Sequence, residues 1–254
     1  MPAMEGRVAV VTGGSRGVGF GIAEEFVGQG ASVVITDIDQ ALLDEAVAAL
    51  GPEVSGFKAD VTSLADMEAL YSQVLARHGR LDAVVANAGV GDSAPLGSIT
   101  EKQFDFIFGV NAKGVLFTVQ PAMPLLPSGG TIVIIGSTAS VKAEYGMSLY
   151  GGSKAAIRAF VRAWIRDIRG SGVRINVLSP GAVDTPSLRN ALHGSLGEPG
   201  QVDAWIKERG EESPIGRLAD PREMGKAAVF LSSDASSFVT GVELFVDGGM
   251  AQTG

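Results

Sequence analysis

Short apolar runs with strand character alternate along the whole chain with longer stretches of helical periodicity, and this alternation constrains the fold most. The strand-like runs cover residues 8–11, 32–36, 54–58, 83–86, 131–135, 174–178 and 242–246. The helical stretches cover about 18–28, 39–50, 63–78, 101–126, 149–169 and 221–232. This pattern predicts an α/β fold, a doubly wound parallel sheet of about seven strands with helices on both faces. Ligands of such sheets bind beyond the carboxyl ends of the strands.

The first strand-like run leads directly into a glycine-rich turn. Thr12 is followed by the spacing Gly13-x-x-x-Gly17-x-Gly19, and a helical pattern begins at once. Glycines let the backbone approach a pyrophosphate, and the free amides of a helix N-terminus bind its charge. A glycine cluster alone is more often a plain turn, and this spacing is not the common G-x-G-x-x-G. Because a strand precedes it and a helix follows, we predict a dinucleotide site.

Composition narrows the classes of function. The 254 residues carry no linker, charge block or repeat that would divide them, so we predict one domain over 1–254. A net charge of -8 and a pI near 4.8 argue against nucleic acid or an anionic membrane as partner. The absence of cysteine excludes disulfides and thiolate metal sites, and we expect no metal. No secretory signal or membrane-spanning stretch is visible, so we expect a cytoplasmic protein.

Polar residues close the next strand-like runs. Asp37 ends the second, where an acidic side chain accepts hydrogen bonds from the adenosine ribose. The alternative for Asp37 is an ordinary helix N-cap, because a helical run follows. Asp60 ends the third run and could reach the adenine, although a turn or cap role is nearly as good an interpretation. Asn87-Ala88-Gly89 ends the fourth, where small residues would let cofactor and backbone pack closely.

Tyr150 and Lys154 are the candidate reacting groups. They lie four residues apart on a predicted helix, so they share one face. A neighbouring ammonium favours the phenolate and lowers the pKa of the phenol, which suits it to acid/base work near neutral pH. The alternative is a solvated helix face, which is what most chance pairs of this spacing are. Ser137 follows the fifth strand, thirteen positions before Tyr150.

Together these motifs resemble the short-chain dehydrogenase/reductase superfamily, in its short single-domain branch, over about residues 6–250. The resemblance rests on the Thr12–Gly19 turn, Asn87-Ala88-Gly89, Ser137, the Tyr150/Lys154 pair, the run 176–181 and the closing Val246-Asp247-Gly248-Gly249. One departure is Ala86, where many members have an Asn. The resemblance implies a Rossmann-type fold and a hydride transfer between a nicotinamide cofactor and a carbonyl or secondary alcohol.

The resemblance also implies roles for individual residues. Tyr150 would be the acid/base, and Ser137 would stabilise the substrate oxygen, so that these two contact substrate. Lys154 would tune Tyr150 and hold the nicotinamide ribose, and Asn111 would hold a water linking Lys154 to solvent. The catalytic set is Asn111, Ser137, Tyr150 and Lys154. The expected cofactor contacts are Gly13, Ser15, Arg16, Gly17, Val18, Gly19, Asp37, Ile38, Asp60, Val61, Asn87, Ala88, Gly89, Tyr150, Lys154, Pro180, Gly181, Val183 and Thr185.

The choice between NAD and NADP depends on two residues of opposite charge. Asp37 would repel a 2'-phosphate, which favours NAD. Arg16 favours NADP by family analogy, although an arginine paired with a carboxylate need not be free to bind phosphate. We therefore expect NAD, with NADP possible. Two alternatives to a secondary alcohol dehydrogenase or ketone reductase stay open: an NADPH-dependent 3-oxoacyl-[acyl-carrier-protein] reductase, and a catalytically silent dinucleotide-sensing protein.

Two further expectations concern the surface. Residues 187–212 are polar and glycine-punctuated, with neither strand nor long-helix signal beyond a two-faced piece at Val202, Trp205 and Ile206, so we predict a mobile substrate lid. His193 within it is expected to be solvated. The stretches 101–126 and 149–169 are more apolar than one sheet face needs. We therefore expect a homotetramer, with a dimer as the alternative.

Overall fold

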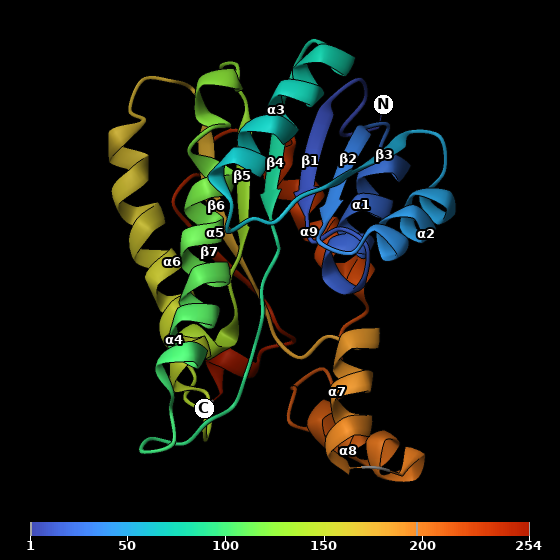
Figure 1. The fold of residues 1–254 in the computed structure, drawn as a ribbon, viewed down its shortest axis with the longest axis vertical. Coiled ribbons are helices and arrows are strands. Elements are labelled where there is room, and N and C mark those ends of the chain that lie inside the picture. The colour runs from blue at the N-terminus through green and yellow to red at the C-terminus, as the bar shows by residue number, and fades with distance from the viewer. Residues whose placement is uncertain (1, 197, 254) are drawn as a thin grey trace.

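Seven parallel strands form the centre of the fold in the computed structural model, which describes residues 2–196 and 198–253 (Figure 1). The strand order is β3-β2-β1-β4-β5-β6-β7. The strands are β1 (Val8–Thr12), β2 (Ser32–Asp37), β3 (Val54–Lys58), β4 (Ala83–Ala86), β5 (Thr131–Ile135), β6 (Arg174–Pro180) and β7 (Glu243–Val246). The order reverses between β1 and β4, which is where a doubly wound sheet opens a crevice for ligands. The predicted fold class is confirmed.

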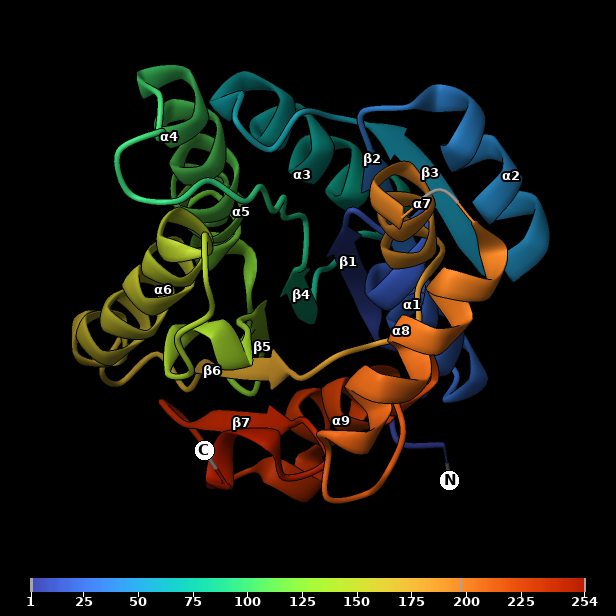
Figure 2. The ribbon, with the colours of Figure 1, turned by 90° about the horizontal axis from the view of Figure 1, so that it is seen from below.

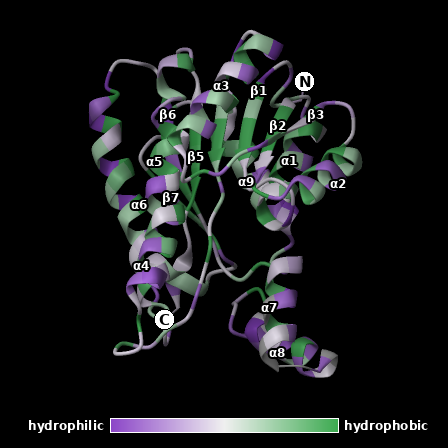
Figure 3. Ribbon diagram, in the orientation of Figure 1, coloured by the Kyte–Doolittle hydropathy of each residue, from purple (hydrophilic) through white to green (hydrophobic). Residues whose placement is uncertain are grey.

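Helices cover both faces because the strands are apolar on both sides. On one face Val10, Val84 and Ile134 pack against α3 (Leu64–His78), α5 (Gly114–Val119) and α6 (Ser148–Asp167). On the other, Val11 and Val85 pack against α1 (Gly17–Gly28), α2 (Gln40–Leu50) and α9 (Pro221–Ser232). Figure 2 shows the sheet end-on between these two layers, and Figure 3 shows the strands as the most hydrophobic part of the chain. This three-layer core fixes the positions of the strand ends.

Two helical regions differ from the predicted ones. The stretch 101–126 is broken into α4 (Glu101–Phe108), a π-helical turn (Gly109–Lys113), α5 and a 3₁₀ turn (Met123–Leu125). The interpretation of 187–212 as a segment without long helices is wrong. Most of its described residues belong to α7 (Pro186–Leu196) and α8 (Pro199–Glu211), which lie at the carboxyl end of the sheet (Figure 1). Pro near each helix start supports helix there, and the glycines of the segment did not prevent it.

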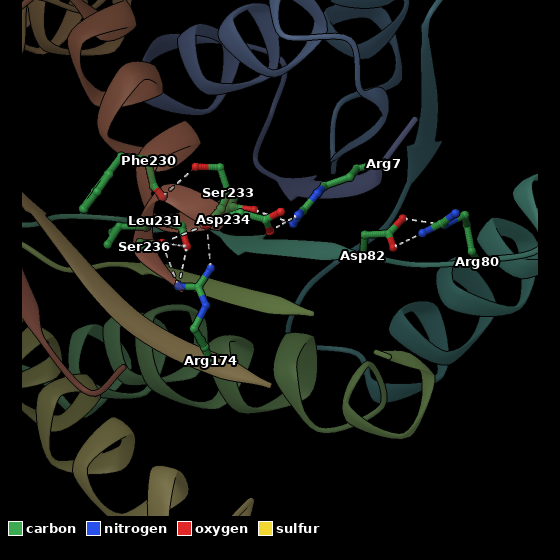
Figure 4. Close-up of polar contacts among 10 residues, drawn as sticks. Arg7, Arg80, Asp82, Arg174, Phe230, Leu231, Ser233, Asp234 and Ser236 are labelled. Atoms are coloured by element: carbon green, nitrogen blue, oxygen red, sulfur yellow. Dashed lines mark hydrogen bonds and ion pairs between the residues drawn. The ribbon is translucent and has the colours of Figure 1, made fainter. Parts of the chain in front are cut away.

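Buried charged side chains lie at the amino ends of the strands, opposite the carboxyl ends that face α7 and α8 (Figure 4). Arg174 opens β6 with 8% exposure and donates to the carbonyls of Leu231, Ser233 and Val239 and to the Ser236 hydroxyl. Asp82, just before β4, accepts from the Val8 amide and from two nitrogens of Arg80. These bonds fix the last helix and the first strand to the sheet.

No helix within the described residues is long and apolar enough to span a membrane. Aromatic side chains remain on the outer helix surfaces: Phe104 of α4 is 46% exposed and stacks on Phe108, and Phe160 of α6 stacks on Trp164. The chain is described by itself, so the association into a tetramer stays a prediction.

Candidate active site

A cleft of about 560 Å³ opens where the strand order reverses. It is lined by residues that follow β1, β2, β3 and β4, and by the π-helical turn and Ser187 of α7. Most of the predicted cofactor contacts from the first half of the chain therefore meet in one place. They are Gly13, Arg16, Gly17, Val18, Gly19, Asp37, Ile38, Asp60, Val61, Asn87, Ala88 and Gly89.

The glycine turn brings backbone to the floor of this cleft. Gly13 and Gly17 have φ of +62° and +57°, a conformation that glycine adopts without strain. At Gly19 a Cβ atom would lie 2.2 Å from the carbonyl oxygen of Gly13 and 2.5 Å from Nδ2 of Asn87. The turn is thus as tight as the chain allows, and only glycine fits at its end.

Helix α1 begins at this turn without a capping side chain. Its N-cap residue, Arg16, makes no side-chain hydrogen bond to the first turn, so no cap satisfies the amides there. The turn is held instead from β4, because Asn87 Nδ2 donates to the carbonyls of Thr12 and Gly13. The Thr12 hydroxyl accepts in return from the amides of Asn87 and Ala88. A braced turn with free helix amides fits a pyrophosphate group.

Asp37 is fixed at the end of β2. One carboxylate oxygen accepts a hydrogen bond from the Ser15 hydroxyl, and the other accepts from the Asp39 amide at 3.2 Å. The N-cap of α2 is Asp39, which accepts from Ala41 and Leu42, so the N-cap alternative does not hold for Asp37. Ser15 does not line the cleft, and its hydroxyl orients the carboxylate. The carboxylate therefore faces the cleft from a fixed position.

Arg16 and Asp60 also line the cleft, with different surroundings. Arg16 is exposed, and among the described residues no carboxylate pairs with it. The suggestion that a carboxylate might occupy this arginine is therefore wrong. Asp60 accepts from the amide and the hydroxyl of Thr62, so it closes a turn while facing the cleft. Its two interpretations are compatible.

A second cleft of about 470 Å³ joins the first and contains the predicted reacting groups. The clefts share Val18, Asn87, Gly89, Val90 and Ser187. The second is lined in addition by Ser137 after β5, by Tyr150 and Lys154 of α6, and by residues after β6. Pro180, Gly181 and Val183 are thus beside the reacting groups, whereas Thr185 lies outside both clefts, against Gly17.

Ser137, Tyr150 and Lys154 are close together in this second cleft. The Ser137 hydroxyl is near enough to the Tyr150 phenol to lower its pKa, and it accepts from the Ala139 amide at 3.1 Å. The Lys154 ammonium lies 5.8 Å from the centre of the Tyr150 ring and donates to the carbonyl of Ile135 at 2.8 Å. Gly89 packs against Lys154, where an added Cβ would lie 3.3 Å from Nζ. The family spacing has placed the three side chains on one surface.

The electrostatics of the pair differ from the prediction. Burial raises the pKa of Tyr150, the hydrogen bond to Ser137 lowers it and the charge of Glu144 raises it. Burial also lowers the pKa of Lys154 to about 8, because the ammonium loses its hydration. Its Nζ donates to the Ile135 carbonyl, and its charge is not among the causes that shift the pKa of Tyr150. The lowering by Lys154 that the sequence predicts is therefore not found in this structure.

Asn111 lies in the π-helical turn and is fully buried. Its Oδ1 accepts from the Val90 amide, and its Nδ2 donates to the Val90 carbonyl and the Ser153 hydroxyl. A Cβ added to Gly89 would lie 3.4 Å from the same Oδ1 and 3.3 Å from Lys154 Nζ. Asn111 thus joins the strand end that carries Asn87 to the helix that carries Tyr150. The water that the resemblance assigns to it stays a prediction.

Helix α8 is tied by an ion pair to the loop that precedes Tyr150. Arg209 of α8 pairs with Glu144, in the loop between Ser137 and Tyr150, and also with Glu212. Arg189 of α7 pairs with Asp184. His193 is exposed, in agreement with the prediction. Sequence reasoning missed several cleft residues. Among them are Val90, which directly follows the Asn-Ala-Gly motif and could have been included, and Lys113 of the π-helical turn, for which the sequence carries no signal.

Comparison with known proteins decides the family. A family model described as enoyl-(acyl carrier protein) reductase matches residues 13–251. The chain is 45% identical over 251 residues to oxidoreductase asL5 of Sarocladium schorii, a match that covers 98% of this chain and 97% of that protein. The chain belongs to the short-chain dehydrogenase/reductase family. The predicted resemblance is confirmed.

Two further relatives extend the comparison. The chain is 35% identical to galactitol 2-dehydrogenase of Agrobacterium fabrum, over 97% of this chain and 98% of that one. The ligand-free structure of Thermoplasma acidophilum aldohexose dehydrogenase superposes with a TM-score of 0.92 at 28% identity, covering 100% of this chain and 97% of that one. The protein is thus an oxidoreductase of the CH–OH group that uses a nicotinamide dinucleotide. The braced glycine turn and its cleft fit that cofactor.

Proposed function

We propose that the protein interconverts a small uncharged ketone and its secondary alcohol, with Tyr150 as acid/base. The observation that carries this proposal is that Ser137, Tyr150 and Lys154 line one cleft, and that this cleft joins the dinucleotide cleft. A positioned acid/base beside a hydrogen-bond donor is the arrangement that carbonyl reduction requires. When bound, the nicotinamide supplies or accepts the hydride.

Each side chain then has one task. In reduction, Tyr150 donates its proton to the carbonyl oxygen, and in oxidation the phenolate takes the proton from the alcohol. The Ser137 hydroxyl donates a hydrogen bond to the same oxygen as negative charge develops on it. Lys154 holds the nicotinamide ribose, and when it is protonated it places a positive charge in the same cleft as Tyr150. Asn111 keeps the end of β4 and helix α6 in register through Val90 and Ser153.

An uncharged substrate is supported by the lid. The arginines of α7 and α8, Arg189 and Arg209, are both paired with carboxylates of the chain itself. Neither is therefore presented to an anionic substrate such as an acyl phosphopantetheine. The names of galactitol 2-dehydrogenase and of the diacetyl reductase of Staphylococcus aureus, 34% identical, support small polyols and diketones as the first compounds to assay.

We propose NAD as the preferred cofactor. The carboxylate of Asp37, held by Ser15 and Asp39, lies where it would accept from the ribose hydroxyls and repel a 2'-phosphate. Asp37→Ser should therefore raise the ratio of kcat/KM with NADP to that with NAD by at least about fivefold, because one repelling charge at this distance is worth ~1 kcal/mol or more. The unpaired Arg16 would assist the phosphate in the variant. A wild-type enzyme that is already faster with NADP would contradict the assignment.

The catalytic proposal is tested by Tyr150→Phe. The variant loses only the phenolic oxygen, so turnover should fall by ~10²–10⁴ while folding and cofactor binding persist. Steady-state kinetics with a panel of ketones and polyols, a fluorescence titration with NADH and a thermal melt measure the three properties.

Tyr145→Phe is the matched control, because Tyr145 is 86% exposed and lies five positions earlier. Its turnover should equal that of the wild type. A Tyr150→Phe protein within about threefold of wild-type turnover would overturn the proposal, since a positioned acid/base contributes far more than that.

A further inference from the structure

Glu243, the first residue of β7, brings a nearly buried carboxylate close to the reacting cleft without lining it. Its side chain is 10% exposed. Oε1 accepts from the Ser179 hydroxyl at 2.7 Å and from the Ser140 hydroxyl at 3.1 Å. Oε2, which accepts no hydrogen bond from the described residues, forms an ion pair with Nε of Arg158. A carboxylate is retained in such a place only when partners compensate the loss of water.

The three partners come from three separate segments, and each segment carries a piece of the proposed active site. Ser140 ends the 3₁₀ turn that Ser137 begins, with its amide bonded to the Ser137 carbonyl at 3.0 Å. Arg158 lies on α6 one turn after Lys154 and also donates to the Ser140 carbonyl. Ser179 directly precedes Pro180 in β6. One carboxylate thus joins the segments that bear the hydroxyl, the phenol and the wall of the cleft.

The sheet explains why β7 can do this. β5, β6 and β7 are neighbouring strands (Figure 2), and Glu243 pairs in register with Val177 of β6, two residues before Ser179. Close packing leaves these segments little room for error: a Cβ at Gly151 of α6 would lie 2.7 Å from the Ala139 carbonyl, and one at Gly136 would lie 2.3 Å from Oγ of Ser179. A shift of any one segment is transmitted to the others through Glu243.

We propose that Glu243 is a positioning residue for the reaction, which holds the Ser137 turn, helix α6 and the end of β6 in register. This rests on the proposed function of Ser137 and Tyr150. Glu243 contacts no reacting atom, and its effect passes through the Ser140 hydroxyl and the Arg158 guanidinium. When the contacts of Glu243 with Ser140, Ser179 and Arg158 are lost, the Ser137 hydroxyl is no longer held beside the Tyr150 phenol.

Glu243→Gln tests the proposal, because the amide oxygen still accepts from both serines while the attraction for Arg158 is lost. We expect kcat at saturating cofactor to fall by about tenfold, since small misplacements of reacting groups are costly. The KM of the cofactor should stay within about twofold, because Asp37 and the glycine turn are untouched. The rising limb of the oxidation pH profile should move to higher pH, because the Ser137 bond that favours the phenolate is weakened.

Asp82→Asn is the matched control. Asp82 is a carboxylate of similar burial, 6% exposed, which likewise has three polar contacts, but at the amino ends of the strands. It should lower the melting temperature as Glu243→Gln does, with kcat and the pH profile unchanged. Equal losses of kcat in the two variants, or a folded Glu243→Gln with wild-type kcat and pH profile, would overturn the proposal.

Ser140→Ala keeps the proposal testable if Glu243→Gln fails to fold. It removes one hydroxyl from the Ser137 turn and leaves the Glu243–Arg158 ion pair in place. We expect a several-fold fall in kcat and the same direction of pH shift. A Ser140→Ala enzyme with wild-type kinetics would overturn the proposal. If instead Tyr150→Phe retained turnover, the proposed function would fail first, and the two failures are thus distinguishable.

Discussion

Polar residues have opposite roles at the two ends of the strands. At the amino ends, Arg174 and Asp82 are buried, and their bonds go to other parts of the same chain. At the carboxyl ends of the strands, the Arg16 guanidinium has no ion-pair partner among the described residues, and the Asp37 carboxylate and the Tyr150 phenol face a cleft. Satisfied polar groups stabilise the fold, whereas groups that face a cleft are available for a ligand.

Two helix starts show the same difference at closer range. Asp220 caps α9 in a capping box with Glu223, which satisfies the first amides of that helix. Helix α1, which packs against α9, has Arg16 at the corresponding position and no cap. An uncapped start sacrifices ~1 kcal/mol of local stability. Helices α6 and α8 also begin without a capping side chain, and at α1 the uncapped amides face the dinucleotide cleft.

The largest effect should come from removing a buried charge at the amino ends of the strands. In Arg174→Met, three carbonyls and a serine hydroxyl lose a buried charged donor. Each carbonyl keeps another donor, from Ser236 or Asn176, so the loss is that of one or two hydrogen bonds to a charged group, ~1.5–3 kcal/mol each. We expect unfolding free energy to fall by roughly 3 kcal/mol and Tm by roughly 6–12 °C. The turnover of the folded protein should be unchanged, because no bond of Arg174 reaches either cleft.

Thermal melts and steady-state kinetics at 25 °C measure the two properties of Arg174→Met. The control is Arg169→Met, an exposed arginine whose loss should change stability by less than ~0.5 kcal/mol. If Arg174→Met reduced turnover in proportion to its loss of stability, the amino ends of the strands would serve the reaction as well as the stability of the fold.

Much of this division could be predicted from the sequence. The seven strands are apolar on both faces, so their positions were read from short runs, and each came within two residues of its observed bounds. Asp37, Asn87 and Ser137 end or closely follow strands in the chain, and parallel strands bring all such ends together. Local pattern was enough because the contacts of these residues are dictated by the sheet.

A second prediction sharpens the comparison within one helix. Gly19→Ala places a Cβ 2.2 Å from the Gly13 carbonyl oxygen, so the glycine turn must shift. Overpacking of this kind costs ~1–3 kcal/mol, and we expect the Kd of NADH to rise by at least about tenfold. A fluorescence titration measures it.

Gly28→Ala, at the other end of α1, has no heavy atom within 4 Å of the new Cβ. It should leave the Kd unchanged and raise stability by up to ~1 kcal/mol, as alanine does in helices. Equal effects of the two variants on NADH binding would show that the turn does not act as a cradle.

The sequence does not reveal the contacts between distant segments. Glu243 and Ser140 lie 103 positions apart, and Arg209 and Glu144 lie 65 apart. No local pattern pairs them, because each pair depends on side-chain directions that only the packed fold fixes. The pKa of Tyr150 illustrates this. Spacing identifies Lys154 as its neighbour, whereas burial and Glu144, neither of which spacing reveals, raise it.

The smallest predicted effect therefore concerns that pKa, and it has two opposite signs. Burial raises the pKa of Tyr150, the Ser137 hydrogen bond lowers it and Glu144 raises it. Oxidation needs the phenolate, so its rate climbs with pH through this pKa. Ser137→Ala removes a lowering contact, and the rising limb should move to higher pH. Glu144→Gln removes a raising charge, and the limb should move to lower pH. Each shift should be below ~1 pH unit, the equivalent of 1.36 kcal/mol.

Profiles of kcat for alcohol oxidation against pH, at saturating NAD, measure both shifts independently of the plateau rate. Arg209→Gln separates the charge of Glu144 from its ion pair with α8, because it breaks the same pair and leaves the carboxylate charged. Its limb should not move to lower pH, since an unpaired carboxylate disfavours the phenolate at least as strongly as a paired one. If Arg209→Gln and Glu144→Gln moved the limb to lower pH alike, the effect would come from loss of the ion pair between α8 and the loop that carries Glu144. The field of Glu144 would then play no part in setting the pKa of Tyr150.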